Sequence, residues 1–375
     1  MLTFRLSRTS SLPLHIQLLD ELRHQIMSGI AKPHDRLPGE WELVRTLNIS
    51  RATIQRAWQA AEDEGLIYRI AGKGTFVAEL RRPADARCMV GFFIPEYRGT
   101  FAVQMLSGAE QVLRKHGYAV QFASTDRDMN EENRLIQRLI DEDAAGCILV
   151  PVRGTTHGRL LASGGVKMPI VLMDRPINGL VLPCVLSNNY MGGLQAMDHL
   201  IGLGHRRILF VARPHLDLWS VSERYRAYQD AMQRIGETPE PPFLIGSNAE
   251  MSSYEAYLSQ GDDEIMPLVE RLRRDRSLTA IFAVNDWLAI KVQRAISLAG
   301  LDNPADISLI GFDDLDIAQY QTPPLTTIAQ NAALMGAEAA RRLITLIEGE
   351  QNQNILTLLP TQLVERQSTA PPKDQ

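Results

Sequence analysis

Hydrophobic residues near the start of the chain recur every three or four positions, which is the spacing of one face of an α-helix. Leu14, Leu18, Leu22 and Ile26 follow this pattern, with polar residues among them. The pattern predicts an amphipathic helix over residues 14–30, which must bury its apolar face against other parts of the chain.

Residues 37–77 predict two further helices and a hairpin in close succession. The expected order is a helix over 40–47, a break at Asn48, a cap at Ser50, a helix from Arg51, and strands over 66–69 and 75–77. Helix, turn, helix and a two-stranded ribbon form the plan of a winged helix-turn-helix, whose second helix enters the DNA major groove. The segment therefore predicts a DNA-binding unit. The alternative is an ordinary helical domain with a solvated basic face.

From residue 88 the pattern changes to short apolar runs that alternate with helical stretches. The expected strands cover 89–94, 119–123, 146–152, 170–173, 184–186, 208–211, 243–245, 280–283 and 307–312. The expected helices cover 102–116, 131–141, 191–203, 224–235, 263–274, 286–299 and 332–347. Such alternation predicts parallel sheets covered by helices. Because so many strands exceed one comfortable sheet, we expect two α/β lobes with a cleft between them.

The expected fold class is an α+β winged helix-turn-helix head followed by an α/β two-lobed core with two parallel sheets flanked by helices. The expected boundaries are 1–78 for the head, 79–87 for a charged linker, 88–369 for the core and 370–375 for a tail. Lobe 1 is expected over about 88–188 and 330–350, and lobe 2 over about 189–329 and 351–369.

Composition and charge narrow the possible partners. The chain has 375 residues and a net charge of −5, so it is not a general polyanion binder, and its local basic groups favour a specific DNA site. It has neither a secretory signal nor an apolar run near the roughly 20 residues of a membrane span. Cys88, Cys147 and Cys184 are scattered without metal-ligand spacing, which is typical of thiols in a reducing compartment. We expect a cytoplasmic protein without membrane association, metal or cofactor.

Basic and polar side chains gather at the start of the helix that begins at Arg51. Thr53, Gln55 and Arg56 lie in its first two turns, where a helix in the major groove contacts base edges. The amide of Gln55 pairs best with adenine, and Lys73, at the tip of a Gly-Lys-Gly turn, suits a phosphate. This helix is therefore the expected reader of the operator.

Several motifs at fixed spacing lie in the same stretch. They include Asp35-Arg36-Leu37-Pro38-Gly39-Glu40, Ile49-Ser50-Arg51-Ala52-Thr53-Ile54, Glu64-Gly65-Leu66-Ile67 and Gly72-Lys73-Gly74-Thr75-Phe76-Val77. On these motifs, residues 14–77 resemble the GntR-type winged helix-turn-helix of bacterial transcription regulators. The resemblance implies double-stranded DNA as a partner, contacted by Arg36, Glu40, Trp41, Ser50, Arg51, Ala52, Thr53, Gln55, Arg56, Gly72, Lys73 and Gly74. Trp41 and Gln55 stand where that family often has Arg, so a distinct operator sequence is expected.

A second group of motifs lies in the α/β part. The most specific are Asp306-Ile307-Ser308-Leu309-Ile310-Gly311-Phe312-Asp313-Asp314 and Pro324-Leu325-Thr326-Thr327-Ile328-Ala329-Gln330, with Met173-Asp174-Arg175-Pro176 and Ser222-Glu223-Arg224 in support. On these motifs, residues 87–367 resemble the sugar-binding core of LacI/GalR-type regulators, which share the fold of periplasmic sugar-binding proteins. Asn331 stands where that family usually has Pro, which leaves a crossover turn open. The minor-groove hinge helix of that family is absent.

Polar and aromatic residues follow several of the expected strands, where open α/β sheets bind their ligands. In part by the LacI-type resemblance, the expected effector-binding residues are Phe101, Asp174, Arg175, Trp219, Arg224, Asn285, Asp286 and Asp313. Their polar groups supply the donors and acceptors that sugar hydroxyls need, and the rings offer stacking faces. The structural alternatives are a helix cap at Asp286, an ion pair between Asp174 and Arg175, a turn at Asp313, a helix-end anion partner for Arg224, and core positions for Phe101 and Trp219.

The favoured hypothesis is a bacterial transcription repressor. It binds a pseudo-palindromic operator as a homodimer, and a sugar-like effector bound between the lobes changes its operator affinity. An activator or a corepressor-dependent regulator with a non-sugar ligand is the alternative within this class. From another class, an aminotransferase-like enzyme fused to a GntR-type head would need a Schiff-base lysine, for which Lys115, Lys167, Lys291 and Lys373 are poorly placed. A transport binding protein does not fit a chain with a DNA-binding head.

Overall fold

The structure is a computed structural model, and it divides into two compact units, Met1–Ala86 and Arg87–Gln375, here called the head and the core. It describes residues 4, 6, 12–27, 30–64, 66–70, 73–78, 88–96, 100–152, 161, 166, 168–246, 261–349 and 355–373. The linker expected over 79–87 lies outside these residues.

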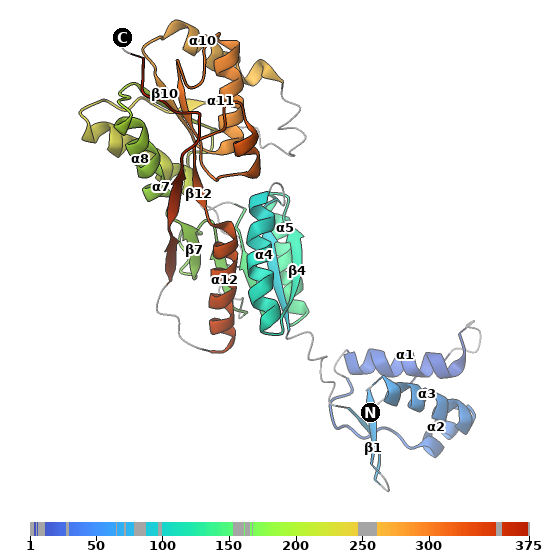
Figure 1. Ribbon diagram of the computed structural model, residues 1–375. Helices are drawn as coiled ribbons and strands as arrows, with labels where there is room; N and C mark the ends of the chain where they lie inside the picture. The colour runs from blue at the N-terminus through green and yellow to red at the C-terminus, as the bar shows by residue number, and fades with distance from the viewer. Residues whose placement is uncertain are drawn as a thin grey trace. The chain divides into compact units, whose positions relative to one another are not determined.

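The head consists of three helices and a hairpin (Figure 1). These are α1 (Leu14–Met27), α2 (Glu40–Leu47), α3 (Arg51–Asp63), β1 (Ile67–Ile70) and β2 (Gly74–Val77), with β1 and β2 antiparallel. Asn48 ends α2 in the left-handed conformation, with φ 51°. The Ser50 hydroxyl accepts a hydrogen bond from the Thr53 backbone N–H at 3.1 Å, which starts α3. The predicted break and cap are therefore confirmed.

An apolar cluster of its own holds the head together. Leu18 and Leu22 of α1 pack with Ile54 and Trp58 of α3, and all four side chains are buried. The i, i+4 spacing of each pair turns one face of its helix inward, as the hydrophobic pattern predicted. The opposite face of α3 is left for solvent or a partner, and it carries Arg51, Gln55 and Arg56.

The core is built on two parallel sheets joined by a short antiparallel pair (Figure 1). Lobe 1 holds the six-stranded sheet β13-β7-β6-β5-β3-β4, and lobe 2 holds the four-stranded sheet β11-β10-β8-β9. The strands of lobe 1 are β3 (Met89–Ile94), β4 (Ala119–Ser124), β5 (Gly146–Leu149), β6 (Ile170–Met173), β7 (Cys184–Ser187) and β13 (Leu356–Leu359). Those of lobe 2 are β8 (Ile208–Ala212), β9 (Phe243–Leu244), β10 (Ala280–Ala283) and β11 (Ser308–Ile310). The pair is β12 (Thr327–Gln330) with β14 (Thr361–Val364).

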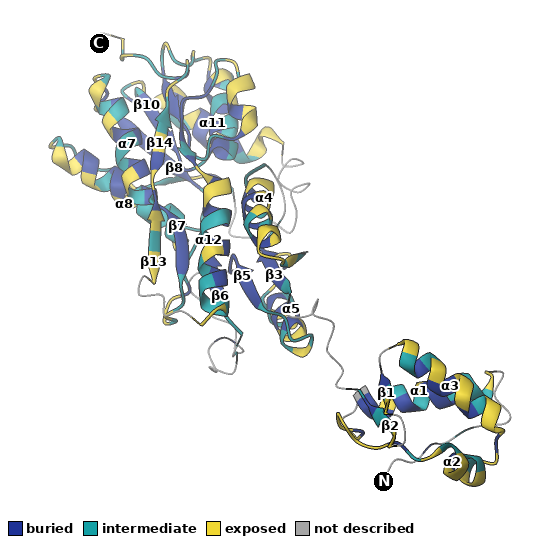
Figure 2. Ribbon diagram, turned by 60° about the horizontal axis from the view of Figure 1, so that its bottom comes forward, coloured by how far each residue is buried: buried dark blue, intermediate teal, exposed yellow. Residues whose placement is uncertain are grey.

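Helices cover these sheets with their apolar faces (Figure 2). They are α4 (Thr100–Lys115), α5 (Met129–Asp141), α7 (Asn189–Gly202), α8 (Trp219–Arg234), α10 (Met266–Arg274), α11 (Asp286–Leu298) and α12 (Ala332–Ile347), with 3₁₀ turns at Asp262–Ile265 and Asp316–Tyr320. In lobe 1, α4 and α12 share one apolar cluster and α5 contributes to another. In lobe 2, one cluster joins the sheet to α7, α8, α10 and α11. Among the described residues, no helix is long and apolar enough to cross a membrane.

The chain passes between the lobes at three places. It crosses from β7 to α7, from β12 to α12, and from β13 to β14 through Pro360. The last crossing differs from the expected division, which gave all of 351–369 to lobe 2. β13 pairs with β7 at the edge of the lobe 1 sheet, because its main chain completes the row of parallel hydrogen bonds there. The lobe boundary at this crossing therefore falls at Pro360.

Two glycines bring α4 and α12 into backbone contact. A Cβ at Gly108 would lie 1.9 Å from the Ala333 carbonyl oxygen, and a Cβ at Gly336 would lie 1.9 Å from the Met105 carbonyl oxygen. No real side chain tolerates such distances, so the helices can cross this closely only at glycine. The start of α12, which follows the crossover strand β12, is thereby fixed against α4 of lobe 1.

Candidate DNA-reading surface and effector cleft

The exposed side of the head carries a connected group of four side chains from α2 and α3. The Glu40 carboxylate accepts hydrogen bonds from Arg51 Nε at 2.8 Å and from Gln55 Nε2 at 3.2 Å. The Arg51 guanidinium also lies over the Trp41 ring, 5.3 Å from its centroid. One carboxylate and one indole therefore set the position of the arginine at the start of α3.

The other expected DNA-binding residues lie at the start of α3 and at the wing. Ala52 and Arg56 are exposed, and the Thr53 hydroxyl lies 2.8 Å from that of Ser50. Arg36 pairs with the wing strand at Phe76, and its side chain fills the space beside Gly74, whose φ is 125°. Lys73 is exposed at the turn. Gly72 lies outside the described residues.

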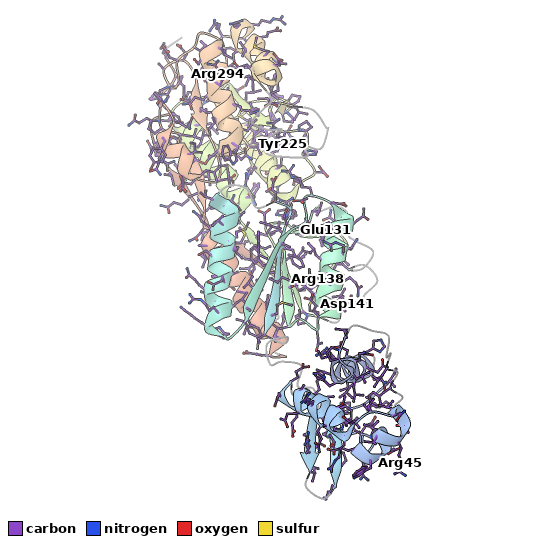
Figure 3. The ribbon with its side chains drawn as sticks, turned by 90° about the vertical axis from the view of Figure 1, so that its right-hand side faces the viewer. Arg45, Glu131, Arg138, Asp141, Tyr225 and Arg294 are labelled. Carbon is purple, nitrogen blue, oxygen red and sulfur yellow. The ribbon has the colours of Figure 1, made fainter. Side chains whose placement is uncertain are left out.

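Arg45 lies one turn after Trp41 on α2 and is labelled in Figure 3. Its Nε donates to the Trp41 carbonyl oxygen at 3.3 Å. The bond helps to fix the helix turn that presents the indole, and the guanidinium itself is exposed.

In the core, Arg224 of α8 is the centre of a buried polar network. It is only 5% exposed, its Nε donates to Asn189 Oδ1 at 2.9 Å, and its Nη1 donates to the Val284 carbonyl oxygen at 2.6 Å. Its Nη2 forms an ion pair with Asp313 at 3.4 Å, and its guanidinium carbon lies 3.6 Å from the centroid of the Phe312 ring. Burial lowers the pKa of Arg224, and the charges of Asp313 and Asp174 oppose that effect.

Asp313 follows β11 in a strained backbone conformation. Its φ of 116° is rare for a residue with a side chain, and such strain concentrates at functional sites. Its Oδ1 accepts a hydrogen bond from Gln330 Nε2 at 2.7 Å, so the crossover strand β12 takes part in the network. Burial raises the pKa of Asp313 to about 6, although Arg224 and Gln330 act in the opposite direction.

Gln330 also brings an unused acceptor to the network. Its side chain is 9% exposed, and its Oε1 has no hydrogen-bond partner among the described residues. A buried polar atom without a partner is costly, and native proteins seldom keep one unless a ligand or water satisfies it. A water or a bound group with a hydroxyl or N–H donor would satisfy this atom.

Lobe 1 contributes Asp174 and Arg175 from the carboxyl end of β6. Asp174 has a φ of 67°, and its Oδ2 forms an ion pair with Arg175 at 2.9 Å, with both side chains largely buried. The negative charge of Asp174 acts to raise the pKa values of Arg224 and Asp313, which both lie in lobe 2. Each lobe thus contributes one ion pair, Asp174 with Arg175 and Asp313 with Arg224, and the charge of Asp174 acts on the second pair.

Asn285 and Asp286 lie behind this group. Asn285 Oδ1 caps α11 by accepting from the Leu288 N–H at 2.9 Å. Asp286 is fully buried, and its oxygens accept from the Thr327 hydroxyl at 2.5 Å and the Leu315 N–H at 2.8 Å. Burial and the charge of Asp313 raise the pKa of Asp286 to about 8. This carboxyl group ties α11 to the loop after Asp313 and to β12, and it supports the cleft from behind.

The two expected aromatic platforms differ in their surroundings. Phe101 is half-buried and packs against the apolar cluster that α4 and α12 share. Trp219 begins α8 in lobe 2, yet its ring packs against the lobe 1 cluster that includes Ile177 and Leu161. Trp219 is therefore an apolar contact between the lobes. Among the described residues, no group of His, Cys, Asp and Glu could hold a metal ion.

Comparisons with known proteins decide the family. Residues 15–77 match the bacterial regulatory proteins of the gntR family, and residues 197–369 match the periplasmic binding protein-like domain. The arabinose metabolism transcriptional repressor of Geobacillus stearothermophilus is 32% identical over 371 residues, which cover 96% of this chain and 99% of the relative. The chain belongs to the family of this repressor. The expected GntR-type head, two-lobed core and transcription-regulator assignment are thereby confirmed.

Solved structures similar to the core of the regulator hold sugars. A LacI family transcriptional regulator from Enterococcus faecalis V583 with bound ribose is 26% identical, with a TM-score of 0.63 over 76% of this chain and 100% of that chain. A periplasmic binding protein/LacI transcriptional regulator from Alkaliphilus metalliredigens QYMF, in complex with D-xylulofuranose, is 25% identical, with a TM-score of 0.61 over 75% of this chain and 99% of that chain.

Asn189 and Gln330 belong to the network of the regulator but were not among the expected site residues. Gln330 ends one of the motifs that carry the LacI-type resemblance, so a signal for it was present in the sequence. Neither is charged, Asn189 lies three residues after the strand predicted at 184–186, and Gln330 follows none of the strands predicted from apolar runs. Their roles depend on crossings between the lobes, which hydrophobic pattern alone does not locate.

Proposed function

We propose that the regulator represses transcription in the cytoplasm by binding a pseudo-palindromic operator as a homodimer. A neutral sugar bound between its lobes changes its affinity for that operator. The observation that carries the effector part is the buried group of Arg224, Asp313 and Gln330, with an acceptor left without a partner. The bound ribose and D-xylulofuranose of similar solved structures support a sugar as the ligand class.

The charges at the cleft favour an uncharged ligand. Arg224 is paired with Asp313, and Arg175 is paired with Asp174, so each guanidinium already faces a carboxylate. A phosphate placed here would compete with both carboxylates. Hydroxyl groups, in contrast, can donate to the carboxylates and to Gln330 and accept from the remaining guanidinium N–H groups. We assign effector binding to these five residues.

The remaining expected residues take supporting roles in this proposal. Phe101 and Trp219 supply apolar surface beside the proposed effector site. Asn285 caps α11, and Asp286 holds the loop at Leu315 and the strand β12 in place. Two described lysines lie in helices of the core, and neither supports the alternative of an enzyme with a Schiff-base lysine. Lys291 pairs with Glu264 on the side of α11, and Lys115 ends α4. We therefore propose a regulator without a catalytic activity of its own.

Thermal-shift measurements test the effector assignment. The full-length regulator is heated with L-arabinose, D-ribose, D-xylose or ribose 5-phosphate, and we expect a neutral sugar to raise the melting temperature of the core. At a ligand concentration 100 times Kd the gain is about 2.7 kcal/mol. Gln330→Leu should abolish the gain, whereas Gln321→Leu, a matched change outside the network, should keep it. If none of the sugars raises the melting temperature, the sugar-effector proposal fails.

The DNA-binding assignment is tested separately. Arg51→Ala should weaken operator binding about 5- to 150-fold, because a good charged contact to DNA contributes about 1–3 kcal/mol, and it should leave sugar affinity unchanged. Arg114→Ala removes the same charge from α4 of the core, where the side chain is exposed, and should leave operator binding intact. Unchanged binding by the Arg51 variant would contradict the assignment of α3. If the bound effector changes the free energy of operator binding by about 1–3 kcal/mol, operator affinity changes about 5- to 150-fold.

A further inference from the structure

The head contains two tryptophans with opposite environments. Trp58 is 1% exposed and lies in the apolar cluster, whereas Trp41 is 62% exposed and lies outside it. Trp58 therefore contributes to the packing of the head, whereas packing does not explain why an apolar ring stands at position 41. A large apolar ring held at the protein surface beside the start of α3 is placed to contact a partner.

The contacts of Trp41 hold its ring beside the start of α3. Its ring supports the Arg51 guanidinium, and Arg51 shares one oxygen of Glu40 with Gln55. The cation–π contact and the shared carboxylate hold three side chains in one fixed arrangement. Because Glu40 is engaged by Arg51 and Gln55, its charge is offset where it would otherwise repel phosphates.

The chemistry of the indole limits what it can recognise in DNA. Its ring offers one N–H donor and an extensive apolar face, whereas base edges in the major groove present one apolar feature, the C5-methyl group of thymine. Arg51 matches the acceptors of guanine, and Gln55 matches the donor–acceptor pair of adenine. An apolar face held beside these two side chains therefore matches a thymine next to the purine that they contact.

We propose that Trp41 is a specificity-determining residue that reads the methyl group of a thymine adjacent to the purine contacted by Arg51 or Gln55. Glu40 positions Arg51 and Gln55 for this contact and does not itself read a base. The inference rests on the proposed function of the head. It adds a base preference to that function.

Removal of single methyl groups from DNA tests the proposal. A binding site is first selected by the full-length regulator from a pool of random duplexes at fixed salt. Each thymine of the selected site is then replaced by deoxyuridine, which removes only the methyl group. We expect one replacement in each half-site to weaken binding by the wild type about fourfold per half-site, as the burial of one methyl group implies. In Trp41→Ala the same replacement should have no effect.

Two further variants make the result specific. Gln59→Ala changes an exposed side chain elsewhere on α3 and should keep the full effect of the methyl group. Glu40→Gln should weaken selection at the bases read by Arg51 and Gln55 together, because both lose their shared charged acceptor. Equal effects of every deoxyuridine replacement on the wild type and on Trp41→Ala would overturn the inference and leave Trp41 only as a support for Arg51. Failure of the wild type to select any sequence would overturn the DNA-binding function as well.

Discussion

Replacement of Asp286 by asparagine should remove much of the pH dependence of the stability of the core. The carboxyl group is fully buried between α11, the loop at Leu315 and the crossover strand at Thr327. Asparagine has the same shape, and its oxygen can still accept from the Leu315 N–H. Its amide can donate to the Thr327 hydroxyl, which rotates to accept. The variant therefore keeps the packing and loses only the ionisable group.

The pKa of Asp286 sets the size of the effect. Burial and the charge of Asp313 raise the pKa from 3.8 to about 8. Between these values the folded protein keeps a proton that the unfolded chain has lost, so the stabilising contribution is complete below about pH 4 and is lost as pH rises through 8. Each pH unit in this window costs up to about 1.4 kcal/mol, or about 4 kcal/mol between pH 5 and pH 8.

Calorimetry of the full-length protein measures this dependence. A loss of about 4 kcal/mol lowers the melting temperature of a domain of this size by roughly 10 °C, and we expect that decrease in the wild type between pH 5 and pH 8. Asp286→Asn should show a much smaller decrease, to which Glu132 still contributes because burial raises its pKa to about 7. Asp316→Asn, at an exposed position, should behave as the wild type. Parallel curves for the wild type and Asp286→Asn would refute this account of the buried carboxyl.

Two further substitutions address the packing of the core. Gly336→Ala should lower the melting temperature of the core by at least 5 °C, because the added Cβ would collide with the Met105 carbonyl oxygen. Gly202→Ala, with open space around the position, should have little effect. Equal melting temperatures of the two variants would contradict the close helix crossing. Trp219→Ala should weaken binding of the sugar that gives the largest thermal shift about tenfold in isothermal titration, because it removes an apolar contact between the lobes. An unchanged affinity would show that this contact does not assist lobe closure.

Much of the fold could be predicted from the hydrophobic pattern. Helices such as α2 and α12 begin and end where the sequence predicted, because a polar cap and an amphipathic stripe define each of them. The central strands were equally clear, since strands buried on both faces read as continuous apolar runs. The crossover elements β12, β13 and β14 were not predicted as strands. β12 and β14 are half polar, and β13 leaves Leu356 and Leu358 exposed at the edge of its sheet. All three become strands only through pairing with distant partners.

The candidate site was only partly accessible to sequence reasoning. Position after a strand singled out Asp174 and Asp313, and in the structure each of them pairs with an arginine at the carboxyl end of its strand. It could not separate Asp286, which is buried behind the site, from residues that line it, because both follow a strand. The unpartnered oxygen of Gln330 depends on the local three-dimensional packing, and no sequence pattern reports such an atom.

The position of Gln330 gives the cleft a direct mechanical connection to lobe 1. The next residue, Asn331, caps α12 through its side chain, and α12 crosses α4 with backbone in contact at Gly336 and Gly108. A ligand that binds Gln330, which already donates to Asp313 at 2.7 Å, therefore acts next to a helix that cannot slide past its neighbour without collision. The chain leaves the head directly before β3, which belongs to the same lobe 1 sheet. An effector bound at Gln330 would therefore act on lobe 1 through the start of α12.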